Sequence, residues 1–221
     1  MSGRRGLLIF DLDGTLLDTL DDLAASLNYA LTCCGLPARS RDEVQSFIGN
    51  GVRLLVRRAL PKDTDAERET QVFAAFAGHY REHCADLTRP YAGVEDMLRQ
   101  VRQAGFATAV VSNKSHREVQ TLCERFFPGL LDMAAGERPG LARKPAPDLP
   151  RLVLGELGFR PEQACYIGDS PVDIETAVNA GTDCVCVSWG FRSRQELIRA
   201  GAARIADSPA ALAALLVAER D

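Results

Sequence analysis

Short apolar runs alternate with amphipathic stretches along most of this chain, and that alternation limits the folds it can adopt. Six runs have the length and the non-alternating pattern of buried strands, the last of them more weakly: residues 7–10, 106–112, 130–135, 164–168, 184–189 and 203–206. Helical patterns separate these runs, such as the apolar face that runs from Val94 to Val101. Buried strands that alternate with helices are typical of a doubly wound parallel sheet, so we predict the α/β class.

Several predicted helices have recognisable starts. Ser115 and Glu118 form a capping box before one helix, and Ser193 and Glu196 form another. Pro209 follows an Asp-Ser pair and suits the first turn of the last helix. These signals place helix starts after three of the predicted strands.

Residues 18–84 interrupt the alternation, because no convincing strand occurs there. Apolar residues at helical spacing predict several helices, including one over residues 52–60 and one that begins at a capping box of Thr64 and Glu67. Residues 85–94 read as the linker that returns to the sheet. We therefore expect a helical bundle inserted into the α/β domain, with these bounds: core 1–17 and 85–221, insert 18–84.

Composition excludes some classes of protein. The chain has 221 residues and a formal net charge of −4, whereas a nucleic-acid partner usually needs a basic face. No stretch approaches the roughly 20 apolar residues of a membrane span, and the N-terminal apolar run is too short for a signal peptide. The seven cysteines include no CxxC pair, which favours core packing over a disulfide framework or a zinc site. We expect a soluble, cytoplasmic protein with no membrane partner, as a monomer or a homodimer.

Asp11 and Asp13 close the first predicted strand. Side chains alternate along an extended backbone, so both carboxylates should point to the same side. Two carboxylates held so close either share a cation or leave one of them protonated. Gly14 and Thr15 follow at once and allow a sharp turn that brings backbone N–H groups near the site, which makes Thr15 a candidate substrate-binding residue. The alternative is a solvated acidic loop.

Polar residues also close the later strands, where ligands bind in a sheet of this kind. Ser112 and Asn113 offer a hydroxyl and an amide after the second strand, and Lys144 is pinned by the proline that follows it. Asp169 stands at the tip of another strand, and Asp173 lies in the first turn of the next helix. Each has a simpler reading as a cap, a surface residue or a capping-box acid.

Together these residues point to phosphate chemistry. A phosphate dianion could not approach four carboxylates unaided, because each like-charge pair at about 4 Å costs roughly 4 kcal/mol at an effective dielectric constant near 20. A divalent cation and Lys144 would remove that obstacle. Oxygen ligands and a phosphate partner favour Mg²⁺.

The chain resembles the haloacid dehalogenase (HAD) superfamily of aspartate-dependent phosphohydrolases over residues 7 to about 190. The stretch "DLDGT" resembles its first motif, Ser112 its second, Lys144 its third and "GDSPVD" its fourth. The resemblance implies a HAD-like Rossmannoid core, a Mg²⁺ cofactor and a small phosphorylated metabolite as the partner. It also implies that Asp11 is the nucleophile, which forms an aspartyl-phosphate, and that Asp13 is the general acid and then the base.

The remaining roles are also implied by the resemblance. Ser112, Asn113 and Lys144 would hold the transferring phosphoryl oxygens. Asp169 would bind the metal with the Asp11 carboxylate and the Asp13 backbone carbonyl, and Asp173 would support that site directly or through water.

The insert resembles the helical cap that some members carry between the first and second motifs, and the nearest group is that of the phosphoglycolate phosphatases. The resemblance makes 2-phosphoglycolate the first candidate substrate. Gly49, Asn50 and Gly51 could expose backbone N–H groups to its carboxylate, with Arg53 as a helper. The alternative is a plain helix start with Arg53 solvated.

Other readings stay open. Residues 136–148 lack the acidic run of well-studied phosphoglycolate phosphatases, so pyrophosphate, a nucleotide or a sugar phosphate also fits. Asp13 argues against a dehalogenase or a phosphonoacetaldehyde hydrolase, and the chain lacks the TxxRGxS-like loop of β-phosphoglucomutase, a phosphotransferase. A catalytically silent binding or regulatory protein would be expected to lose a nucleophile or a metal ligand, and this chain keeps both.

Overall fold

The computed structural model describes residues 6–49 and 51–219, and the chain forms two compact units. The first unit combines Met1–Leu17 with Pro90–Asp221, and the second is Asp18–Arg89. The second unit thus includes part of the segment that we expected to be the return linker.

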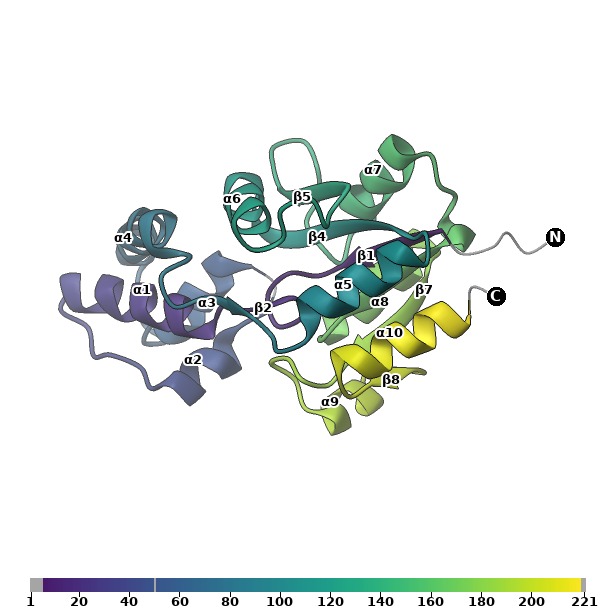
Figure 1. Ribbon diagram of the computed structural model, residues 1–221. Helices are drawn as coiled ribbons and strands as arrows, with labels where there is room; N and C mark the ends of the chain where they lie inside the picture. Colours follow the sequence, from purple (N-terminus) through teal and green to yellow (C-terminus); the bar gives the residue numbers. More distant parts are fainter. Residues whose placement is uncertain (1–5, 50, 220–221) are drawn as a thin grey trace. The chain divides into compact units, whose positions relative to one another are not determined.

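A six-stranded sheet forms the centre of the first unit (Figure 1). Its strands lie in the order β5-β4-β1-β6-β7-β8, and every recorded pairing is parallel. The strands are β1 (Leu7–Phe10), β4 (Ala107–Ser115), β5 (Met133–Glu137), β6 (Ala164–Gly168), β7 (Asp183–Val187) and β8 (Ile205–Ala206). All six predicted strands are present in this sheet.

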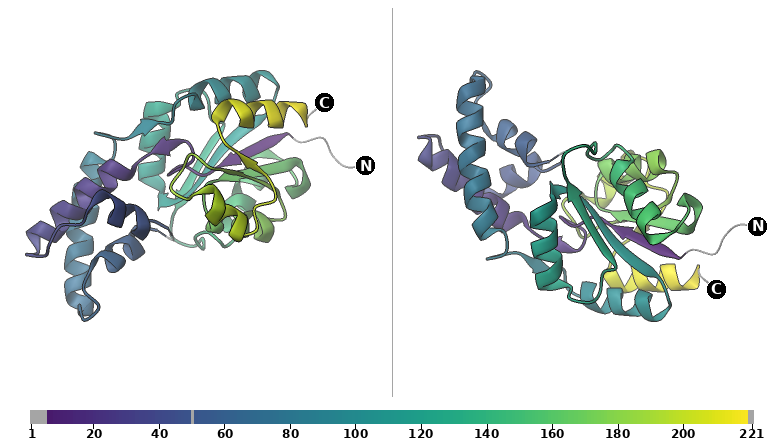
Figure 2. Two further views of the ribbon diagram at one scale, coloured as in Figure 1. Left: turned by 90° about the horizontal axis from the view of Figure 1, so that it is seen from below. Right: turned by 90° about the horizontal axis from the view of Figure 1, so that it is seen from above.

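Helices cover both faces of the sheet, so the prediction of a doubly wound α/β fold is confirmed (Figure 2). On one face lie α5 (Val94–Gln103), α6 (His116–Phe126) and α10 (Pro209–Ala218). On the other lie α7 (Asp148–Leu157) and α8 (Pro171–Ala180). The short helix α9 (Arg194–Arg199) follows β7, and a 3-10 turn (Pro161–Gln163) precedes β6.

β1 has neighbours on both sides and helices above and below, which explains its continuous apolar sequence. Its four side chains have an exposed fraction of zero. Ile9 belongs to a core cluster with Val111 of β4, Tyr166 of β6 and Val153 of α7. This buried centre fixes the position of the residues that follow β1.

The predicted helix caps are present in the first unit. The Ser115 and Ser193 hydroxyls accept the N–H groups of Glu118 and Glu196, and both glutamates return the bond, so both capping boxes are confirmed. α10 begins at Pro209, as expected, with Ser208 as its N-cap.

Four strands differ from their predicted bounds. β7 (Asp183–Val187) ends two residues before the predicted run does, and β8 (Ile205–Ala206) begins two residues later than predicted. β4 continues past residue 112 to Ser115, with an irregular register against β5 between Val111 and Ser115. β5 begins at Met133 because the chain turns after α6, where the N–H of Leu130 donates to the carbonyl of Phe127. In the sequence, the apolar residues of this turn could not be distinguished from the start of a strand.

The described residues of the second unit are mainly helical: α1 (Leu20–Cys33), α2 (Arg41–Phe47), α3 (Val52–Ala59) and α4 (Ala66–His83). The predicted start of α4 is wrong, because Asp65 caps it and accepts the N–H of Arg68 at 2.7 Å. A short sheet of β2 (Leu17–Asp18) and β3 (Arg89–Pro90) lies where the chain passes between the units. Within residues 6–49 and 51–219, no helix has the length and apolarity needed to cross a bilayer.

Candidate active site

The candidate site lies at the carboxyl end of β1, where the strand order reverses. From β1 the chain proceeds to β4 and β5 on one side, and later to β6, β7 and β8 on the other. In doubly wound sheets the crevice beyond such a switch point is the usual place for a ligand. The predicted site residues of the first unit follow β1, lie at the end of β4, follow β5 or follow β6.

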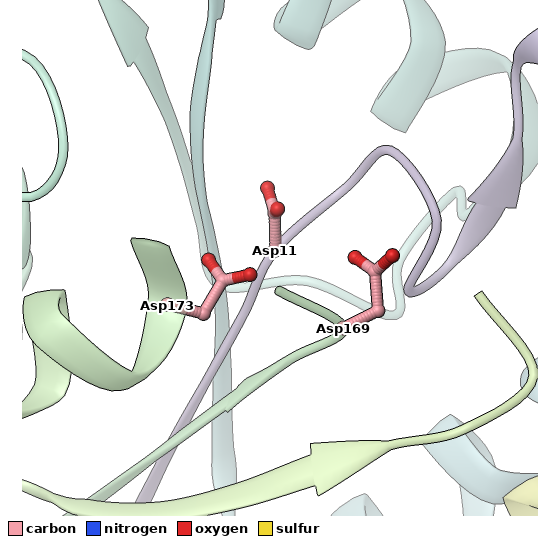
Figure 3. A group of neighbouring side chains, drawn as sticks. All are labelled: Asp11, Asp169 and Asp173. Atoms are coloured by element: carbon pink, nitrogen blue, oxygen red, sulfur yellow. The ribbon is translucent and has the colours of Figure 1, made fainter. Parts of the chain in front are cut away.

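Three buried aspartates converge at this point. Asp11 follows β1, Asp169 follows β6 and Asp173 lies in the first turn of α8. Each can offer a carboxylate oxygen such that the three oxygens lie within 4.8 Å of one another. Figure 3 shows the three carboxylates facing a shared space beyond the strand ends. The sequence prediction that these acids gather is therefore in agreement with the geometry.

The Asp13 side chain does not join this group. Its Oδ1 lies 3.0 Å from Nζ of Lys114, whose side chain is only 1% exposed. Lys114 was missed at the level of sequence, although it follows Ser112 and Asn113 in the stretch that drew attention to the end of β4. Because the chain has only three lysines, a lysine so close to Ser112 was a sign in the sequence that could have revealed it.

Gly14 makes the turn after Asp13. Its φ is +82°, in the region that favours glycine, and a Cβ there would lie 2.7 Å from Cγ of Asp169. The turn therefore brings the backbone after β1 directly against the acid at the end of β6.

Lys144 joins two of the clustered aspartates. Its Nζ lies 2.9 Å from Asp11 and 2.8 Å from Asp173, and its side chain is 3% exposed. The Asn113 side chain holds the Lys144 backbone from both sides: Oδ1 accepts its N–H at 2.7 Å, and Nδ2 donates to its carbonyl at 3.0 Å. Asn113 thus positions Lys144, and its predicted contact with substrate stays a prediction.

The two predicted hydroxyl residues are both buried at the site. Ser112 is 1% exposed, and its Oγ accepts the N–H of Lys114 at 3.2 Å. Thr15 is fully buried, and its Oγ1 donates to Oδ1 of Asp169 at 3.2 Å. Thr15 therefore orients an acid of the cluster in this structure, while its predicted contact with substrate is not tested.

A segment after β7 also holds Asp169, and sequence reasoning missed it. The N–H of Phe191 donates to Oδ2 of Asp169 at 2.8 Å. Trp189, which we took for the end of a strand, donates its indole N–H to the carbonyl of Thr15 at 3.0 Å. Backbone donors leave no trace in the sequence, so only the indole could have suggested this segment.

Asp173 is a capping-box acid that also contacts Lys144, while its predicted support of a metal ion stays a prediction. Its Oδ2 accepts bonds from the N–H and the hydroxyl of Ser170, which completes a capping box at the start of α8. Its Oδ1 accepts from Lys144 at 2.8 Å. The Asp173 carboxylate therefore caps α8 and also contacts Lys144 at the site.

Burial and charge shift the pKa values of these groups. Burial raises the pKa of Asp169 to about 7, and the Asp173 carboxylate adds to the rise. Burial also raises the pKa of Asp11 well above its ordinary value, although the Lys144 ammonium opposes the rise; the Asp173 and Asp169 carboxylates add to it. Burial lowers the pKa of Lys144, but the Asp11 and Asp173 carboxylates raise it by more, so the ammonium stays charged.

The cluster fits a hard divalent cation. Three buried carboxylates face one ammonium, which leaves negative charge uncompensated. Burial chiefly, and the neighbouring carboxylates in addition, raise the pKa values of Asp11 and Asp169. The donors are oxygens alone, and Gly14 leaves room where a side chain would press on Asp169. Such a donor set suits Mg²⁺.

The predicted contacts of the insert lie in the second unit. Arg53 is exposed in the first turn of α3, where its guanidinium lies 4.5 Å from the ring centre of Phe73. Gly49 and Gly51 both have positive φ values, and Asn50 lies outside the described residues. Their roles toward a substrate stay predictions.

Fold and site together define a class, the α/β enzymes that gather carboxylates at the switch point of a parallel sheet. Within that class, the chain matches the model of the haloacid dehalogenase-like hydrolases over residues 8–187, and it belongs to that family.

Similar proteins include named phosphatases. The phosphoglycolate phosphatase of Pseudomonas putida is 36% identical over 191 residues, which cover 84% of this chain and 70% of that protein. The N-acetylmuramic acid 6-phosphate phosphatase of Pseudomonas aeruginosa is 32% identical over 185 residues, covering 83% of this chain and 82% of that protein. A crystal structure from Lactobacillus delbrueckii subsp. bulgaricus, whose protein is provisionally called a phosphoglycolate phosphatase, has a TM-score of 0.92 at 36% identity and covers 97% of this chain and 99% of that chain. The prediction of a phosphoric monoester hydrolase is confirmed.

Proposed function

We propose that this protein is a Mg²⁺-dependent phosphatase that hydrolyses a small phosphate monoester through an aspartyl-phosphate on Asp11. The observation that carries the proposal is the placement of Asp11. Its carboxylate contacts Lys144 at 2.9 Å and can share a small ion with two further carboxylates. The proposed nucleophile, the Lys144 ammonium and the carboxylates that could hold a metal ion therefore lie close together beyond the end of β1.

The reaction proceeds in two displacements. An Asp11 oxygen forms a bond to phosphorus as the bond from phosphorus to the ester oxygen breaks, and Asp13 gives that oxygen its proton. Asp13 then takes a proton from water as the water oxygen attacks phosphorus and releases Asp11 with inorganic phosphate. Covalent catalysis divides one difficult displacement into two easier ones.

Lys144 and Ser112 provide the electrostatic part of the site. The Lys144 ammonium is buried and charged, and Ser112 is buried near the end of β4. They would hold the phosphoryl oxygens, whose negative charge must be stabilised during transfer. Because both groups are fixed before the substrate arrives, little reorganisation is needed in the transition state.

Asp11, Asp169 and the Asp13 backbone carbonyl would hold the metal ion, with Asp173 beside them directly or through water. When bound, Mg²⁺ supplies positive charge that offsets the carboxylates and the phosphoryl group. The excess of three carboxylates over one ammonium explains why the site needs it.

We propose 2-phosphoglycolate as the first candidate substrate, since the chain resembles proteins of that name. The N–H groups near Gly49 and Gly51, with Arg53, would bind its carboxylate. A sugar phosphate is the second candidate, because another relative is named for N-acetylmuramic acid 6-phosphate. The shared chemistry is an alkyl phosphate monoester.

The test is an activity screen with and without Mg²⁺. It compares 2-phosphoglycolate, N-acetylmuramic acid 6-phosphate, a nucleoside monophosphate and pyrophosphate, with a chelator-treated sample as the control. We expect turnover of at least one alkyl monoester that chelation abolishes and Mg²⁺ restores. Borohydride added during turnover should convert Asp11 to homoserine, which peptide mass spectrometry detects. Chelator-insensitive hydrolysis, or trapping at another aspartate, would contradict the proposal.

A further inference from the structure

A buried lysine beside the proposed acid and base has no role so far. Lys114 is one of three lysines in a chain with 23 arginines, and its exposed fraction is 2%. Its Nζ lies 3.0 Å from Oδ1 of Asp13, whose side chain is 20% exposed. A buried charge is costly unless it is paired, so this ion pair constrains both side chains.

An irregularity in β4 places Lys114 at the site. The register between β4 and β5 shifts between Val111 and Ser115, and the N–H of Lys114 donates to the Ser112 hydroxyl within that interval. An irregular strand turns successive side chains away from strict alternation. Asn113 holds the Lys144 backbone, whereas the next residue, Lys114, reaches Asp13.

Gly136 of β5 fixes the backbone that carries Lys114. A Cβ at Gly136 would lie 2.6 Å from the carbonyl oxygen of Lys114 and 2.7 Å from Cα of His116. The Gly136 N–H donates to Nδ1 of His116 at 3.3 Å. The edge strand therefore packs directly against the segment behind Lys114, which leaves that segment little room to move.

From this arrangement we infer that Lys114 is a positioning residue, which holds the Asp13 carboxyl group where it exchanges a proton with the leaving oxygen. The inference rests on the proposed function. An aspartate in a turn can otherwise adopt several rotamers, and proton transfer requires a fixed geometry. An ammonium is a compact point charge on a flexible stem, which suits it to hold one oxygen.

A positioning role for Lys114 predicts a kinetic result that a merely structural role does not. Only a poor leaving group needs a proton as its bond to phosphorus breaks. Loss of Lys114 should therefore slow the hydrolysis of alkyl phosphates much more than that of esters with an acidic leaving group. The relevant constant is kcat/KM, since it reports the first irreversible step, transfer of the phosphoryl group to Asp11.

The experiment measures kcat/KM with saturating Mg²⁺ for Lys114→Met and for Lys62→Met, a matched control at an exposed loop position. The substrates are the best alkyl monoester from the screen, 4-nitrophenyl phosphate and 2,4-dinitrophenyl phosphate. In Lys114→Met we expect a loss of about 100-fold on the alkyl ester, the lower range for general acid catalysis, and at most about 3-fold on the dinitrophenyl ester. Asp13→Asn should show the same graded pattern, and Lys62→Met should show no loss.

A loss of equal size on all three esters would overturn the inference, because it would mean that Lys114 supports the site as a whole. An unchanged alkyl rate would overturn it as well. Gly136→Ala keeps the ammonium but displaces its backbone, so it should give a weaker form of the graded pattern if Lys114→Met does not fold. Failure of the wild-type protein to hydrolyse any alkyl ester would instead refute the proposed function, so the two failures are distinguishable.

Discussion

Asp11 illustrates how a single residue can be both costly to the fold and necessary to the chemistry. It lies in a group of three carboxylates that shares one ammonium, and burial adds to the cost of its charge. Such a residue contributes little to folding stability in the metal-free protein. Its presence is explained by what the charge does to a substrate.

Replacing Asp11 by asparagine should therefore separate activity from stability. Asp11→Asn removes the proposed nucleophile and one repelling charge, while Lys144 keeps its contact with Asp173. We expect kcat to fall on the order of 10⁴-fold or more, and the melting temperature in chelator to stay equal or rise. Steady-state kinetics and thermal unfolding measure the two quantities, with Asp63→Asn at an exposed position as the control. Near-normal turnover would rule out Asp11 as the nucleophile.

The raised pKa of Asp169 predicts a pH effect on the metal-free protein. The folded state holds the Asp169 proton up to about pH 7, whereas the unfolded state releases it near the ordinary aspartate pKa of 3.8. The folded state thus binds more protons between these values, so stability must fall as pH rises through that window. Bound Mg²⁺ offsets the charge, so the rise in melting temperature on adding Mg²⁺ should grow from pH 5 to pH 8.

Thermal shifts at several pH values, with and without Mg²⁺, measure this effect. Asp169→Asn removes the titrating group, and its melting temperature in chelator should vary less with pH over the same range. A Mg²⁺ shift that stayed constant or shrank with rising pH would contradict the assignment.

The sequence revealed the acids of the site more readily than their partners. Asp11 and Asp169 directly follow β1 and β6, and Lys144 lies in the loop after β5. The topology of a parallel sheet brings residues beyond these strand ends together. Lys114 and the N–H of Phe191 were missed for different reasons. The first depends on an irregular strand, and the second is a backbone group that every residue but proline carries.

At the scale of elements, strand bounds were predicted correctly where the apolar run in the sequence has the same extent as the buried strand. β1 and β6 have the predicted bounds because both are short apolar runs in the middle of the sheet. The end of β4 was harder, since it continues through polar residues as far as Ser115. Hydrophobicity marks the part of a strand that packs in the core, so a strand that extends into a polar site exceeds its apolar run.

The second unit contains a buried acid that the sequence did not mark. Asp22 of α1 is 2% exposed, and its carboxylate accepts the N–H groups of Leu87 and Thr88 at 2.8–3.1 Å. These bonds tie the segment after α4 to α1 and explain why the unit extends to Arg89. A linker that appears polar in the sequence is thus held by an internal partner.

Removing this acid should destabilise the second unit. Asp22→Ala leaves two backbone N–H groups without their acceptor, and each buried unsatisfied group costs about 1–3 kcal/mol. We expect a lower midpoint in urea unfolding, with Asp21→Ala, an exposed neighbour on the same helix, as the matched control. An equal effect of the two substitutions would show that the Asp22 contacts carry no special weight.

At the scale of the whole molecule, the proposed chemistry belongs to one unit. The described carboxylates, Lys144, Ser112 and Lys114 all lie in the unit formed by Met1–Leu17 and Pro90–Asp221. The core cluster beneath them is also made of residues from that unit alone. The proposed contacts with the rest of the substrate, around Gly49 and Arg53, belong to the other unit. The proposal therefore assigns chemistry and selectivity to two different compact units of the chain.

Excising the second unit tests this division. Leu17 and Pro90 belong to neighbouring strands of the β2–β3 sheet, so a short glycine-serine linker can replace residues 18–89. We expect the shortened protein to unfold cooperatively, to be stabilised by Mg²⁺ and to hydrolyse 4-nitrophenyl phosphate at a reduced rate. It should lose the preference of the full chain among alkyl monoesters, because the parts proposed to bind the rest of the substrate are gone. Asp11→Asn in the shortened protein should abolish the remaining turnover. If the shortened protein folded but kept the full chain's substrate preference, selectivity would have to reside in the first unit, beside Asp13 and Lys114.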